Sequence, residues 1–227
     1  MNDLLFALCP YIALALLVTV PFARIASPAV RRRTLPAALR DWRGLYRGSP
    51  AWRLGIGLVL VGHLLGLTLP NQRVLWRFLP GGPMTLQAAA FGLGLLALAG
   101  CASLVRERFR PAGFSQATLL GSAVDSLFLT LLALGIGSGL VMTFAYHLGS
   151  AWYAVTLAPY LRSLVRLAPD VALVADLPPV VKLHLLSAIA MVAVLPFTAL
   201  GLVLVWPLVV LRRPAAGLVA RRADAAS

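Results

Sequence analysis

The sequence predicts an all-α integral membrane protein with five transmembrane helices, its N-terminus outside and its C-terminus in the cytoplasm. Of the 227 residues, 60% are hydrophobic and only 12% are charged, and the mean hydropathy is +0.90. An ordinary soluble domain carries about twice that share of charged residues. A helix crosses a bilayer with roughly 20 mainly apolar residues, and the chain contains five runs of that kind. We expect them to form a single domain over residues 1–227.

Each long, nearly uncharged run predicts one helix. The runs cover about residues 4–23, 53–70, 84–105, 117–144 and 179–211. The first run is longer than the apolar part of a cleavable signal peptide and is followed by few small residues, so we expect a retained helix. Asp125 is the one charge in the fourth run. The fifth run begins at Pro179, a residue type that favours the first turn of a helix.

The basic residues predict the sidedness. The formal charge is +13, and fifteen of the twenty Lys and Arg residues lie between the first and second helices, between the third and fourth, or after the fifth. Basic residues concentrate in cytoplasmic loops, which fits five helices but not four or six. This topology and the attraction of anionic headgroups explain the basic excess. We therefore expect a multi-pass protein of the inner (plasma) membrane with no nucleic-acid partner.

The sequence excludes several other kinds of chemistry. It has seven acidic residues and no Gly-rich phosphate loop, H-E-x-x-H motif or nucleophile elbow, so hydrolysis is not expected. Cys9 and Cys101 lie at opposite depths of the predicted membrane domain and should be buried small side chains rather than a disulfide. The stretch PYLRSLVRLAPD, residues 159–170, is amphipathic, and we expect it to lie along the outer interface.

Two of the three histidines fall inside predicted helices at matching depth. His63 lies seven residues before Pro70, which places it about 10 Å inside the outer end of the second helix. His184 lies five residues after Pro179, which places it about 7 Å inside the outer end of the fifth helix. Both imidazoles therefore reach one level of the outer leaflet. The third histidine, His147, falls in an outer loop and is expected to be an ordinary solvated residue.

The surroundings of the two histidines favour a bound cofactor. An ionisable residue at membrane depth is costly and by default marks a functional site. The residues three or four positions away are small, with Gly66 beside His63 and with Ser187 and Ala188 beside His184. They leave room for a flat group between the helices, and a haem with two axial imidazoles fits that space. The alternative is a structural hydrogen bond between helices.

The residues around these histidines resemble a known family. LVGHLLGLTLP (60–70) and VKLHLLSAIAMVAVLPF (181–197), together with PYIA (10–13) and Asp125, are similar to the gamma subunit of respiratory nitrate reductase, a five-helix cytochrome b. The resemblance implies that His63 and His184 hold an outer haem near which quinol is oxidised. It also implies an inner haem that passes electrons to an iron-sulfur subunit, in a complex with a molybdenum catalytic subunit.

The chain departs from the family at the inner haem. The positions of the two inner ligands are occupied here by Arg53 and Leu202, neither of which ligates haem iron in the usual way. We therefore predict one haem b, with His63 and His184 as its axial ligands and Met191 as core filling rather than a ligand. We also expect Arg53 to pair with Asp125 in the vacated inner site.

The quinone is less well supported by the sequence than the haem. The family places a lysine near the start of the third helix, and residues 81–91 contain none. Lys182 is the single lysine of the chain. It either meets a haem propionate or a quinone oxygen, or anchors the helix end at the interface.

The sequence thus predicts a membrane-anchor cytochrome b subunit of a nitrate-reductase-like respiratory complex. It would pass electrons between the quinone pool and a partner redox subunit, with the catalytic chemistry residing in another subunit. The alternatives are a non-redox membrane anchor or assembly subunit, and the cytochrome b of another quinone-linked oxidoreductase. A small transporter is disfavoured because the predicted helices contain almost no charge. We expect the Arg-rich segment 26–50 and the C-terminal arginines to form the docking face.

Overall fold

Helices make up all the regular structure in the described part of the chain. The computed structural model describes residues 2–27, 49–68, 82–108, 119–146, 156–198 and 200–201, and no strand occurs among them. The long helices are α1 (Cys9–Ala26), α3 (Pro50–Thr68), α5 (Pro83–Arg108), α6 (Leu119–Ala145) and α10 (Pro179–Val194). The shorter elements are η1 (Leu4–Leu8), α8 (Ala158–Val165), α9 (Ala172–Ala175) and η5 (Leu195–Phe197). Each predicted run therefore contains one long helix.

Four of the long helices have the length and apolar composition needed to cross a membrane. Their apolar spans are Leu4–Arg24, Met84–Arg106, Ala123–Ala145 and Pro179–Phe197. The helix α3 has a shorter apolar stretch over Pro50–Gly66. Many large apolar side chains point away from the bundle and are exposed, including Leu14, Leu58 and Val141. Contact of such side chains with lipid hydrocarbon costs little free energy, whereas their contact with water is unfavourable.

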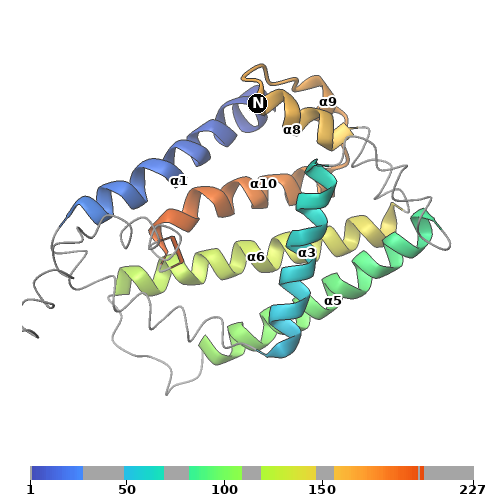
Figure 1. Cartoon of the computed structure of the whole chain (residues 1–227), viewed down its shortest axis with the longest axis horizontal. Helices are drawn as coiled ribbons and strands as arrows, with labels where there is room; N and C mark the ends of the chain where they lie inside the picture. Colours follow the sequence, from blue (N-terminus) through green and yellow to red (C-terminus); the bar gives the residue numbers. More distant parts are fainter. Residues whose placement is uncertain are drawn as a thin grey trace, which may run out of the picture.

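The long helices pack in a defined order. In Figure 1, α1, α10, α6 and α5 follow one another across the view, and each packs against the next, while α3 crosses the view over α6 and α5 and packs on α5. Glycines allow α3 and α5 to approach closely. A Cβ atom at Gly55 would lie 2.8 Å from the Cα of Ala97, and one at Gly100 would overlap the backbone of Trp52. The helices α3 and α10 therefore belong to two different packed pairs.

The short helix α8 is tied to the beginning of the chain by two tyrosines. The Tyr160 hydroxyl donates to the Phe6 carbonyl at 2.6 Å, and the Tyr11 hydroxyl donates to the Leu164 carbonyl at 3.0 Å. Tyr160 is fully buried, and burial, with a smaller contribution from Tyr11, raises the pKa of Tyr160 to about 12. Val165, at the other face, is exposed. The stretch 159–170 therefore contains the amphipathic helix that its sequence predicts.

The last predicted helix is interrupted. The run 179–211 was expected to be continuous, but α10 ends at Val194, a 3-10 turn follows, and Thr198 is extended with φ −76° and ψ 170°. Pro196 accounts for this difference because proline lacks an amide hydrogen and its ring clashes with the preceding turn. The Arg24 guanidinium donates to the Pro196 carbonyl at 2.7 Å and to the Thr198 carbonyl at 3.2 Å. Part of the hydrogen bonding lost at the helix end is thus supplied by α1.

Candidate cofactor site

The structure brings His63 of α3 and His184 of α10 together. Their ring centroids lie 6.1 Å apart and the ring planes differ by 27°. Since α3 packs on α5 and α10 packs on α6, the two imidazoles come from helices that belong to different packed pairs. The matching depths read from the sequence correspond to a real juxtaposition of the two side chains.

The hydrogen bonds of the two rings fix their tautomers. The Nδ1 atom of His63 lies 2.7 Å from the Val59 carbonyl oxygen, one turn earlier in α3. The Nδ1 atom of His184 lies 2.8 Å from the Gly135 carbonyl oxygen of α6. A carbonyl oxygen only accepts hydrogen bonds, so each Nδ1 carries the hydrogen and each Nε2 carries a lone pair. Imidazoles that bind metals are commonly oriented in this way, with the other ring nitrogen donating to a carbonyl.

The two histidines differ in their surroundings. His63 is exposed, and its Nδ1 faces a backbone carbonyl of its own helix. His184 is half-buried, and its ring lies against α6, where a Cβ atom at Gly139 would come 3.1 Å from Cε1. Small residues at such positions let helices and side chains approach closely within a membrane.

The small residues predicted around the histidines occupy different places. Gly66 and Ala188 are half-buried on α3 and α10. Ser187 is buried, its hydroxyl donates to the backbone carbonyl of His184 at 2.7 Å, and it lies beside Gly135 of α6. Ser187 therefore belongs to the interface between α10 and α6, while the contribution of Gly66 and Ala188 to a cofactor site stays a prediction.

The ammonium group of Lys182 is engaged at the end of a short helix. Its Nζ donates to the Ala175 carbonyl at 2.6 Å, in the last turn of α9. A cation at a helix C-terminus is stabilised by the unpaired carbonyls there. This contact does not decide between the two predicted roles, and both the anchor at a helix end and the contact with a propionate or a quinone stay predictions.

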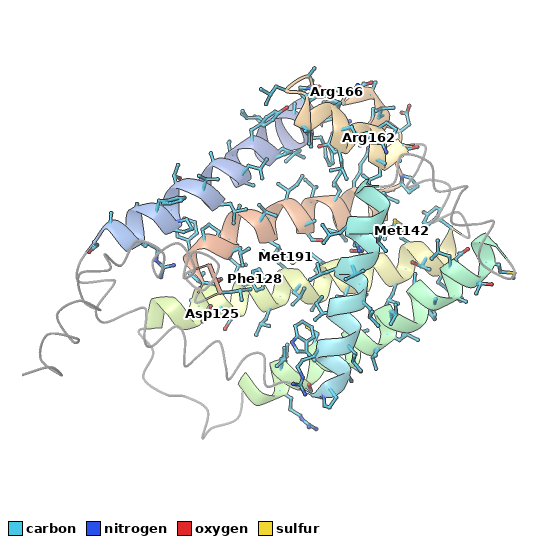
Figure 2. The ribbon with its side chains drawn as sticks, viewed as in Figure 1. Asp125, Phe128, Met142, Arg162, Arg166 and Met191 are labelled. Carbon is cyan, nitrogen blue, oxygen red and sulfur yellow. The ribbon has the colours of Figure 1, made fainter. Side chains whose placement is uncertain are left out.

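Met191 and Asp125 lie farther along the bundle (Figure 2). The Met191 Cε atom would meet a Cβ at Gly135 at 3.3 Å, so this side chain packs between α10 and α6, as core filling does. The expected pairing of Arg53 with Asp125 is not observed: within the described residues, Arg53 is exposed, and the guanidinium that interacts electrostatically with Asp125 is that of Arg24. The hydrogen bonds that Arg24 makes are to the Pro196 and Thr198 carbonyls at the end of α10, and its interaction with Asp125 is electrostatic.

Several predicted positions lie outside the described residues. They are His147, Leu202, most of the Arg-rich segment 26–50 and the C-terminal arginines.

Residues of α6 that the sequence reading did not select contact the site directly. Ser138 lies 3.3 Å from Nδ1 of His184, Gly135 supplies the carbonyl acceptor, and Gly139 supplies space for the ring. The signal was present in the stretch GIGSG at 135–139, because two small residues four positions apart are typical of close packing between membrane helices.

The two histidines suit a metal that already has most of its ligands from a cofactor. Among the described residues, no group of three or more His, Cys, Asp or Glu side chains could hold a metal ion. A zinc ion without a cofactor is usually held by four ligands. A haem supplies the equatorial nitrogens of its iron and leaves two axial positions for the protein. Two imidazole nitrogens at about 2 Å from one metal put the ring centroids about 6 Å apart, and the two rings, which are stacked here, have centroids 6.1 Å apart.

The fold and the site define a multi-helix membrane protein with a pair of histidines held between two of its helices. A family model described as the nitrate reductase gamma subunit matches residues 2–221, and the chain belongs to that family.

Two relatives illustrate the range of the family. The nitrate reductase-like protein NarX of Mycobacterium tuberculosis is 29% identical over 209 residues, which are 88% of this chain and 31% of NarX. The nitrate reductase gamma chain of Bacillus subtilis is 27% identical over 214 residues, which are 93% of this chain and 95% of that protein. The chain thus spans about a third of NarX and nearly all of the gamma chain.

Proposed function

We propose that the chain is the membrane-anchor cytochrome b subunit of a nitrate-reductase-like respiratory complex, in which it passes electrons between the quinone pool and a partner redox subunit. The observation that carries this proposal is the approach of His63 and His184, with ring centroids 6.1 Å apart and each Nδ1 facing a carbonyl oxygen. In each ring Nδ1 faces the carbonyl, so Nε2 is the nitrogen with which a neutral imidazole would bind a metal. Family membership supports the respiratory role.

The chain holds one haem b in this proposal, with His63 and His184 as its axial ligands. A bound haem supplies a centre that accepts and releases one electron at a time, while the oxidation of a quinol yields a quinone, two electrons and two protons. The residues of the chain bind and orient the cofactor and surround it with apolar side chains. A second haem is not proposed, because Arg53 stands at one expected ligand position and Leu202 at the other.

The proposed arrangement in the membrane has five crossings in one domain over 1–227, with the N-terminus outside. The four long apolar helices and the shorter α3 support it, as does the concentration of basic residues in alternate loops. In this arrangement the Arg-rich segment 26–50 and the C-terminal arginines face the cytoplasm. They are available there to an iron-sulfur subunit that connects to a molybdenum catalytic subunit.

A spectrum of the purified protein tests the proposal. The protein in detergent should show a low-spin b-type spectrum when reduced, with about one haem per chain. Changing His63 or His184 to Ala should abolish that spectrum, whereas His147→Ala should leave it unchanged. A colourless protein from haem-replete cells would favour the non-redox anchor instead. A ratio near two haems per chain would contradict the single-haem proposal while leaving the cytochrome assignment intact.

A further inference from the structure

The helix α6 contributes no histidine, yet it makes the closest recorded contacts with the ring of His184. We propose that Ser138 is a positioning residue: together with Gly135 and Gly139 it fixes the plane of the His184 imidazole and sets how strongly that ring donates electrons to the haem iron. This inference rests on the proposed function, because it takes His184 as an axial ligand.

The hydrogen bonds around Ser138 have a definite direction. The Ser138 hydroxyl lies 2.7 Å from the Leu134 carbonyl oxygen, 3.1 Å from the Gly135 carbonyl oxygen and 3.3 Å from Nδ1 of His184. A carbonyl oxygen only accepts, so the hydroxyl hydrogen points to one of these two carbonyls, and a lone pair of Oγ is left to face the ring. The Nδ1 hydrogen of His184 therefore has two acceptors, the Gly135 carbonyl at 2.8 Å and the Ser138 hydroxyl at 3.3 Å.

The packing of α6 restricts the rotation of the ring. A Cβ atom at Gly139 would lie 3.1 Å from Cε1 and 3.3 Å from Nδ1 of His184, closer than nearly all real contacts of that kind. Ser138 itself is only 5% exposed, so little solvent reaches its hydroxyl to compete for the bond. The ring is thus held by hydrogen bonds at Nδ1 and by the close approach of Gly139 to Cε1 and Nδ1.

The contacts with Ser138 and Gly135 act on the haem through the His184 ring. Acceptors on the far nitrogen of a ligating imidazole increase its basicity and orient the ring. An imidazole that donates more strongly stabilises the oxidised iron and lowers its reduction potential, which is one of the means by which a protein tunes a haem. The Ser138 hydroxyl, as a second acceptor for Nδ1 of His184, should therefore lower the potential of the haem.

The test replaces Ser138 with Ala in the full chain and measures the midpoint potential of the haem by spectroelectrochemical titration. We expect the potential to rise, with the low-spin spectrum and the haem stoichiometry unchanged, and we expect Ser138→Thr to restore the original potential because threonine keeps the hydroxyl. The matched control is Ser103→Ala, since Ser103 lies in α5 and its hydroxyl donates to the Gly100 carbonyl at 2.6 Å, within its own helix.

A second pair of variants keeps the inference testable if Ser138→Ala does not accumulate. Gly139→Ala should change the low-spin electron paramagnetic resonance signature, which reports the orientation of the axial rings. Gly137→Ala should not, because a Cβ atom there meets nothing within 4 Å.

Three outcomes would overturn the inference: an unchanged potential in Ser138→Ala, an equal rise in Ser103→Ala, or the same resonance signature in both glycine variants. A wild-type protein without a bis-histidine spectrum would instead refute the proposed function on which the inference rests.

Discussion

The two histidines of the candidate site are supported by different kinds of packing. The helix that carries His63, α3, is in backbone contact with α5 at Gly55 and Gly100, but its imidazole projects beyond that contact and is exposed. The helix that carries His184, α10, meets α6 mainly through side chains, and its imidazole lies within the interface. One side therefore has a firmly seated helix with an accessible ring, and the other has an enclosed ring. The difference indicates that the position of His63 depends on where α3 sits, whereas that of His184 depends on the residues around it.

Removal of either imidazole should have the largest effect on the haem spectrum. Rescue by added imidazole should then distinguish the His63 position from the His184 position. His63→Gly and His184→Gly should both lose the low-spin spectrum. Imidazole added to the detergent solution should restore the spectrum of His63→Gly, because that ring is exposed and leaves an accessible gap. It should not restore His184→Gly, where Ser138 and Gly139 enclose the position. Titration with imidazole, followed by optical spectroscopy, measures this directly, and equal rescue of both variants would remove the distinction.

Replacement of interface glycines by alanine should have the next largest effect. The loss of stability should be greater for Gly100, where α5 meets α3, than for Gly135, where α6 meets α10. A Cβ atom at Gly100 would overlap the Trp52 backbone, which cannot move without displacing α3. At Gly135 the nearest atoms are the ends of side chains, Ser187 Oγ at 3.2 Å and Met191 Cε at 3.3 Å, and they can shift. Overpacking typically costs about 1–3 kcal/mol, and we expect Gly100→Ala to lie at or above the top of that range and Gly135→Ala near its bottom.

Thermal melting in detergent, followed by circular dichroism, compares these two variants. Gly92→Ala serves as the control in α5, because a Cβ atom there meets nothing within 4 Å. A melting temperature for Gly100→Ala equal to that of the Gly92→Ala control would contradict the close approach of α3 to α5.

The smallest expected effect is a dependence of stability on pH. It arises from Tyr160, which packs against α10, the helix that carries His184. Tyr160 packs in one apolar cluster with Val181 and Leu185 of α10, and its pKa is raised to about 12 by burial. In the unfolded chain the phenol has the ordinary tyrosine pKa of about 10. This is lower than its pKa of about 12 in the folded chain. The stabilisation from the neutral buried phenol is therefore complete below about pH 10 and is lost as pH rises through about 12.

Melting temperatures measured between about pH 9 and pH 11.5 should thus fall more steeply for the wild type than for Tyr160→Phe. At neutral pH the variant should be less stable by about 1 kcal/mol, because the hydrogen bond to the Phe6 carbonyl is lost. Parallel pH profiles of the two proteins would show that Tyr160 does not contribute.

The sequence was sufficient for those features that depend on local composition. Long apolar runs predicted the five long helices, and distances counted from Pro70 and Pro179 predicted that His63 and His184 share a level. The amphipathic pattern near 159–170 predicted α8.

The features that depend on how helices meet were harder to predict. The interruption after Val194 lies within a continuous apolar run, where proline can be tolerated in a membrane helix. Arg53 is a candidate partner of Asp125 because both lie at the inner level and Arg53 stands where the family has a haem ligand, but neither reason specifies which helices are neighbours. The role of Ser138 depends on the rotation of α6 about its axis, which is decided by its packing against α10.

The contact of Arg24 with the end of α10 bears on how the chain assembles during synthesis. The guanidinium of Arg24 and its acceptor carbonyls on Pro196 and Thr198 are 172 and 174 positions apart in the chain. The first helix is made and inserted long before these acceptors exist, and its chief long partner is the last helix. We therefore expect α1 to occupy a temporary position in the membrane, with Arg24 near the headgroups, until α10 is inserted. The contact between α1 and the end of α10 therefore forms late relative to the insertion of α1.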